Sequence, residues 1–119
     1  MKIVISKLPP STNHLYAVRA VRGHAMMYVT KEGKEWFEFA GKELKKQWRK
    51  KTPIGTPCEI WIELYLAYDR DIDGSNKAIL DLLQKNGVIK NDSLFYKMDV
   101  EKIKCKKEEA RVELEIMGY

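Results

Sequence analysis

The residues with the clearest capacity for chemistry are three acids at alternate positions, Asp69, Asp71 and Asp73. In extended backbone, alternate residues point to the same side, so this spacing predicts three carboxylates that face one region. Carboxylates held so close repel one another, and their pKa values rise unless a cation lies between them. The segment therefore predicts a site for a divalent metal ion.

An EF-hand calcium loop is the first alternative, because the letters from Asp69 to Gly74 match the beginning of that loop. However, its twelfth position is Leu80 where a bidentate glutamate should close the site, and the preceding residues alternate like a strand. An incomplete cage of carboxylates suits Mg²⁺ better, since this ion keeps waters and accepts phosphate oxygens of a substrate as ligands. This openness is what phosphodiester hydrolysis requires, with the ion activating water and neutralising charge.

Two residues farther along the chain are candidates for the same site. Lys77 follows Asp73 by four residues, so on a helix its ammonium lies on the same face, directed at a phosphate or a leaving oxygen. The alternative is an exposed ion pair between these two, worth only about 0.3 kcal/mol. Asp92 lies beyond that helix, where the chain can return toward Asp71 and Asp73. The sequence Asn91-Asp92-Ser93 is equally typical of an ordinary turn.

The elements that must position these acids follow from hydrophobic periodicity. A strand from Cys58 to Tyr68 leads into Asp69, with one face apolar and the other carrying glutamates and aromatic residues. The apolar face comprises Ile60, Ile62, Leu64 and Leu66, and the other face comprises Glu59, Trp61, Glu63 and Tyr65. A helix capped by Gly74 or Ser75 follows, ends at Gly87, and turns Ala78, Ile79, Leu82 and Leu83 inward.

The remaining segments predict one domain over residues 1–119, an α+β fold with a mixed β-sheet packed against two helices. The expected strands are Ile3–Ile5, Met98–Cys105 and Arg111–Met117, the last two joined by a charged turn at Lys106–Glu109. A loop should cover residues 8–13, and a hairpin with a basic tip should pair Tyr16–Val21 with Met26–Val29. The second helix begins after Thr30 and buries Trp36, Phe37, Ala40, Leu44 and Trp48.

The charge of the chain is positive, with 22 basic and 17 acidic residues and a net charge of +5. This excess suits a polyanionic partner, although many basic proteins bind no nucleic acid. The candidate phosphate contacts are Arg19, Arg22, His24, Lys45, Lys46, Arg49, Lys50 and Lys51. The two cysteines are too far apart in sequence for a zinc or redox motif, and no apolar stretch has the length of a signal peptide or membrane span. We therefore expect a cytoplasmic protein with reduced thiols.

Three stretches resemble the RusA family of four-way (Holliday) junction resolvases. The strongest runs from Tyr68 to Asp73, continues through Asn76-Lys77-Ala78 and Leu82-Leu83, and ends with residues 86–92. The proline-rich segment at residues 8–13 and the segment from Val29 to Trp36 also match in order and spacing. The resemblance implies a RusA-like endonuclease domain and a homodimer that depends on Mg²⁺, with Mn²⁺ as a substitute. Its implied role is to resolve branched DNA by paired cuts in recombination and repair, often in a prophage setting.

Carried over by position, the family's catalytic acids fall on Asp71, Asp73 and Asp92, which are also the implied metal ligands. The family's active-site lysine falls on Lys77. Asn91 stands where some relatives have a further aspartate, and Gly74-Ser75 replaces a more usual Asn-Leu. The number of ligands is therefore open, as is the role of Asp69.

Two other functions stay open on the sequence alone. One is a DNA-binding module without catalysis, in which the acids hold only a structural cation. The other is a nuclease of different specificity, which cuts flaps or RNA. The homodimer that the resemblance implies is physically consistent with a junction resolvase, because symmetric nicking of four arms needs two sites related by one axis.

Overall fold

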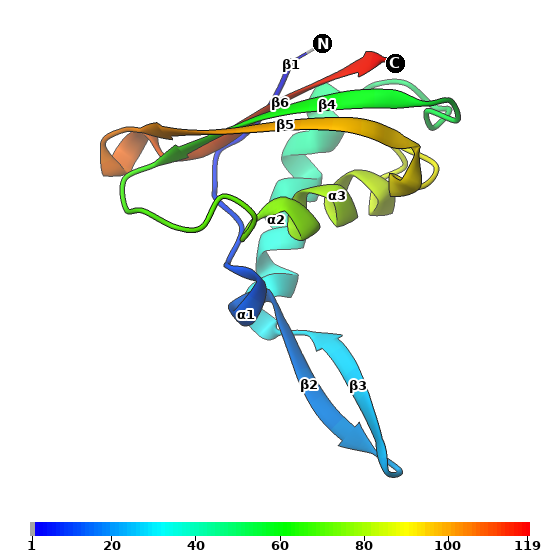
Figure 1. Ribbon diagram of the computed structural model, residues 1–119, viewed down its shortest axis with the longest axis vertical. Coiled ribbons are helices and arrows are strands. Elements are labelled where there is room, and N and C mark those ends of the chain that lie inside the picture. Colours follow the sequence, from blue (N-terminus) through cyan, green and yellow to red (C-terminus); the bar gives the residue numbers. More distant parts are fainter. Residues whose placement is uncertain (1) are drawn as a thin grey trace.

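The computed structural model describes residues 2–119 and contains a mixed four-stranded sheet with helices on one of its faces (Figure 1). The strand order is β1 (Lys2–Ile5), β6 (Arg111–Gly118), β4 (Cys58–Leu66) and β5 (Phe95–Lys104). β5 runs parallel to β4, whereas the other pairs are antiparallel. The helices α2 (Lys31–Gln47) and α3 (Asn76–Lys85) cover the sheet, which confirms the predicted α+β class.

The core lies between this sheet and the two helices. The face of β4 that the alternation predicted as apolar is buried, from Ile60 at 0% to Leu66 at 4% exposure. The predicted inward residues of α3 are buried as well, and they are Ala78, Ile79, Leu82 and Leu83. Burial of such side chains contributes about 1.5–3 kcal/mol each, so this layer fixes where the ends of β4 and α3 lie.

The long helix α2 begins where the sequence predicts. The Thr30 hydroxyl accepts a hydrogen bond from the Gly33 N–H at 3.0 Å, which caps the first turn. Trp36, Ala40 and Leu44 are buried on one side, and the Trp36 indole N–H donates to the Lys7 carbonyl at 2.9 Å. The N-terminal segment is therefore held against the helix.

The predicted hairpin forms from β2 (Tyr16–Val21) and β3 (His24–Val29), which we call the arm. Its turn is Arg22-Gly23, with φ values of 51° and 80°, the left-handed conformations that a tight two-residue hairpin requires. β3 thus begins at His24, two residues before the predicted start at Met26. The arm extends away from the body of the molecule (Figure 1).

One feature differs from the prediction, and the sheet has an order that the sequence did not predict. A short helix, α1 (Thr12–Leu15), replaces the end of the loop predicted at residues 8–13. The consecutive strands β5 and β6 are joined through the 3-10 turn η2 (Lys107–Glu109) but do not pair, because β4 lies between them. The strongly apolar β4 occupies the centre, where both of its edges are paired, and the more exposed β5 takes an edge.

In the part of the chain that the structure describes, no helix has both the length and the hydrophobicity that a membrane crossing needs.

Candidate active site

The acidic segment forms the connection between β4 and α3, and its backbone turns where extended backbone was expected. The Gly74 N–H donates to the Asp71 carbonyl at 3.1 Å, and the Asn76 N–H donates to the Asp73 carbonyl at 3.3 Å. Asp69 is engaged elsewhere, since its carboxylate accepts a hydrogen bond from the Lys102 ammonium at 2.8 Å. That bond lowers the pKa of Asp69. The prediction of three acids aligned by extended backbone is therefore wrong.

Arg70 fixes this connection from its inner side. Its guanidinium donates to the Pro9 carbonyl at 2.7 Å and to the Ser75 hydroxyl at 2.9 Å. Ser75 is fully buried at the N-cap of α3, and burial lowers the pKa of Arg70. The hydrogen bonds of Arg70 fix the backbone on both sides of Asp71 and Asp73. The two carboxylates are exposed to solvent on this turn.

Lys77 lies on the first turn of α3, but its closest acidic partner is not Asp73. Its ammonium is 3.9 Å from the Asp81 carboxylate and 5.1 Å from the centroid of the Tyr16 ring. The Tyr16 hydroxyl donates to the same Asp81 carboxylate. Burial, followed by this hydrogen bond, raises the pKa of Tyr16.

Tyr16 and Asp81 lie beside Lys77, and neither was predicted as a site residue from the sequence. Asp81 follows Lys77 by four residues, which on a helix is itself a signal of contact. Tyr16 is 65 residues away from Asp81 in sequence, and no local pattern marks that contact.

Asp92 lies at the opposite end of α3 from Asp71 and Asp73. It begins the 3-10 turn η1 (Asp92–Leu94), and its N–H donates to the side-chain carbonyl of Gln84 near the helix C-terminus at 3.1 Å. Ten helical residues span about 15 Å, so α3 separates the two sets of acids. Among residues 2–119, no three His, Cys, Asp or Glu side chains are grouped to hold a metal ion. One chain therefore brings Asp71, Asp73 and Lys77 to one end of α3, without Asp92.

The other side chains considered as ligands have partners in this structure. Asn91 uses its side-chain oxygen to accept a hydrogen bond from the Ser93 N–H at 2.9 Å, as the cap of η1. Asp69 is paired with Lys102. The exposed carboxylates of Asp71 and Asp73 fit Mg²⁺, which proteins commonly bind through one or two carboxylates with waters and substrate phosphates as further ligands.

The candidate phosphate contacts fall into two groups at opposite ends of α2. Arg19, Arg22 and His24 are exposed on the arm, whose base adjoins the start of the helix. The others are exposed in or after the last turn of α2, and they are Lys45, Lys46, Arg49, Lys50 and Lys51. A helix of 17 residues is about 25 Å long, so the two groups are separate surfaces.

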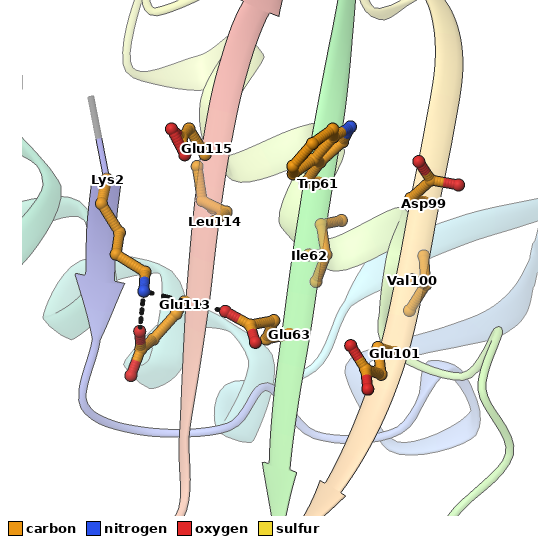
Figure 2. A pocket seen from close by; sticks show the side chains of 10 residues that line it. All are labelled: Lys2, Trp61, Ile62, Glu63, Asp99, Val100, Glu101, Glu113, Leu114 and Glu115. Atoms are coloured by element: carbon orange, nitrogen blue, oxygen red, sulfur yellow. Dashed lines mark ion pairs between the residues drawn. The ribbon is translucent and has the colours of Figure 1, made fainter.

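The uncovered face of the sheet carries an acidic surface, which we call the acidic face (Figure 2). Its acids are Glu63, Asp99, Glu101, Glu113 and Glu115. They line a shallow hollow around Trp61, which is 47% exposed. Figure 2 shows the Lys2 ammonium between two of these acids, 2.8 Å from the Glu113 carboxylate and 3.8 Å from that of Glu63.

Glu113 is the most buried of these acids, at 8% exposure. It also binds the Arg111 guanidinium at 2.6 Å. The hydrogen bond from Lys2 is the main reason that the pKa of Glu113 lies below its ordinary value. These charges stabilise the edge of the sheet, and the net negative surface repels a polyanion.

Comparison with known protein families gives a match over almost the whole chain. The family described as endodeoxyribonuclease RusA matches residues 7–117, which include the arm, the acidic turn, Lys77 and Asp92. No curated protein matches the sequence significantly.

Proposed function

The chain belongs to the RusA family of endodeoxyribonucleases, and on that premise we propose that it resolves four-way DNA junctions by paired, symmetric nicks. The observation that carries the proposal is the family match over almost the whole chain. It is supported by a turn that exposes Asp71 and Asp73 directly before the helix that carries Lys77.

In this proposal Asp71 and Asp73 bind Mg²⁺, with Mn²⁺ as a substitute. When bound, such an ion lowers the pKa of a coordinated water and neutralises charge on the phosphate. Lys77 provides a positive charge for the phosphate or the leaving oxygen, at the N-terminal end of α3 where the helix dipole is also positive. Asp81 holds the Lys77 ammonium on this side of the helix through their 3.9 Å approach.

The position of Asp92 bears on the proposed homodimer. Because α3 separates Asp92 from Asp71 within one chain, Asp92 can act at the same phosphate only if a second copy supplies it. We therefore propose a homodimer in which Asp92 of one copy completes the site formed by Asp71, Asp73 and Lys77 of the other. A two-fold arrangement of this kind yields two equivalent sites.

Mixing two inactive variants tests this arrangement. Asp71→Asn and Asp92→Asn should each abolish cutting, whereas a mixed dimer should regain one intact site and nick one strand of the junction. If both acids act from the same chain, the mixed dimer has no intact site and stays inactive. That result would reject the shared site and leave the nuclease proposal standing.

A synthetic four-way junction with labelled strands tests the proposed function itself. We expect wild-type protein to cut two opposite strands at symmetric positions when Mg²⁺ or Mn²⁺ is added, and not in the presence of a chelator. Binding of the junction without any product in either metal would indicate a non-catalytic module. Faster cutting of flaps or RNA than of junctions would assign another specificity.

A further inference from the structure

The arm exposes an unusual amount of apolar surface for a segment that projects into solvent. Val18 is 67% exposed, Met27 is 59% exposed and Met26 is 52% exposed. An isolated two-stranded hairpin is only marginally stable in water, and exposed apolar patches commonly mark binding surfaces. Packing within the arm does not bury these apolar side chains, so a binding partner is the physical reason to expect for their exposure.

The two faces of the arm differ in chemistry. The cross-strand pairs Val18 with Met27 and Ala20 with Ala25 share one face, which is apolar from there to the tip and has Tyr16 at its base. The opposite face carries Arg19, whose guanidinium lies 5.1 Å from the centroid of the Tyr28 ring. The basic residues Arg22 and His24 lie at the tip.

The charge of the arm indicates the kind of partner. No acidic residue occurs in the sequence before Glu32, so every formally charged side chain of the arm is positive. Two arms from two copies would bring these positive charges together, which disfavours a contact between arms. A polyanion with accessible apolar surface is the complementary partner, and nucleic acid with unstacked bases meets both requirements.

The base of the arm is fixed close to Lys77. The Thr30 hydroxyl donates to the His14 carbonyl at 2.6 Å, and the Gly33 Cα packs so tightly that a Cβ there would lie 2.7 Å from the Leu15 carbonyl oxygen. Tyr16, the first residue of β2, is joined to α3 through Asp81 beside Lys77. Six strand residues span about 20 Å, so the arm extends that far from the candidate active site.

We propose that the arm enters the DNA at the branch point of the junction, with its apolar face against unstacked bases and its basic residues on the flanking phosphates. This inference rests on the proposed function and assigns the recognition of branched DNA to the arm. β-Ribbons enter DNA grooves, and inserted apolar side chains such as methionine open base steps. The bases at a branch point are already partly unstacked, so the cost of insertion is lowest there.

A variant with Val18→Gln and Met27→Gln tests the proposal, because both side chains are exposed and neither contributes to the core. Binding is measured in Ca²⁺, in parallel on a four-way junction and on a linear duplex of the same sequence. A 2-aminopurine base at the branch point reports unstacking. We expect the preference for the junction to fall at least tenfold and the fluorescence increase seen with wild type to disappear. Trp61→Gln, on the acidic face, is the matched control and should behave as wild type.

The possible outcomes separate this inference from the proposed function. If wild type binds and cuts the junction and the arm variant keeps the same preference and fluorescence, the inference is wrong and the nuclease proposal stands. If the variant instead becomes monomeric in sedimentation while its preference is unchanged, the apolar face is a contact between copies and the inference is also wrong. If wild type itself neither prefers nor cuts the junction, both proposals fail.

Discussion

The arm and the acidic face are both exposed β-structure, yet their charges are opposite. The acidic face is the outer side of the sheet that packs on the core, whereas the arm projects away from the core (Figure 1). In the acidic face, the other side of the sheet packs against the core, and the exposed acids are partly balanced by Lys2 and Arg111. In the arm, both sides are exposed and all formal charges are positive. The net charge of +5 is therefore distributed unevenly, with positive charge on the arm and negative charge on the acidic face.

The difference in charge between the arm and the acidic face predicts which side of the molecule faces DNA. A phosphate backbone is repelled by the acidic face and attracted by the arm, whose first residue, Tyr16, lies beside Lys77. The helices α2 and α3 lie between the two surfaces, so the DNA should lie on the helical side of the sheet.

Lys77→Met should lower the rate of junction cutting about 100-fold, because removing one positively charged group from a phosphate site costs about that factor. Affinity for the junction in Ca²⁺ should stay within about threefold, since a single phosphate contact contributes little to the whole. Lys90→Met, an exposed lysine beyond α3, is the charge-matched control. Equal loss of cutting in both variants would remove the special role of Lys77.

Neutralising charges on the two surfaces should have unequal effects. Arg19→Gln with Arg22→Gln should weaken junction binding about tenfold and reduce the slope of log affinity against log salt by about two for each arm that contacts the junction. Asp99→Asn with Glu101→Gln removes two charges from the acidic face and should leave affinity unchanged or raise it up to about threefold. Titrations at several salt concentrations measure both, and equal effects would contradict the contrast.

Glu113→Gln should lower the free energy of unfolding by about 1–2 kcal/mol at pH 7, because it removes hydrogen bonds to two charged partners. Cutting at neutral pH should not change. The pKa of Glu113 is lower in the folded state, so its contribution is present above the unfolded value and is lost as the pH falls through the folded value. The free energy of unfolding of the wild type should therefore fall below about pH 4, and that of the variant should fall less steeply. Denaturant titrations at several pH values measure both.

Asp81→Asn should reduce cutting only about threefold, because the pair with Lys77 is partly exposed and its partner can reorient. If Asp81 acts by positioning the ammonium, this loss should vanish when Lys77 is already methionine. A double-mutant cycle on the cutting rate measures that coupling. Additive losses would assign Asp81 a purely structural role.

Local patterns were sufficient to predict several elements of this fold. The alternation of β4, the helical spacing of α3 and the Thr30 cap of α2 each depend on neighbouring residues, and the structure confirms them. The arm is also local, since a positive φ at Arg22 and Gly23 is all that its turn requires.

Features that depend on distant contacts were predicted less well. The placement of β4 between β5 and β6 depends on which strand fills the centre of the core. Asp69 left the predicted cluster because Lys102, 33 residues away, binds it. The separation of Asp92 from Asp71 follows from packing α3 along the sheet, which spacing in the sequence does not encode.

The exposed turn before α3 is proposed to supply the metal-binding carboxylates, and two isosteric changes on that turn decide whether it does. Asp71→Asn and Asp69→Asn are compared in a cutting assay on a four-way junction with Mg²⁺, alongside junction binding in Ca²⁺. We expect Asp71→Asn to reduce cutting more than 100-fold with binding preserved, and Asp69→Asn to cut within about threefold of wild type. Cutting by Asp71→Asn at the wild-type rate would contradict the account.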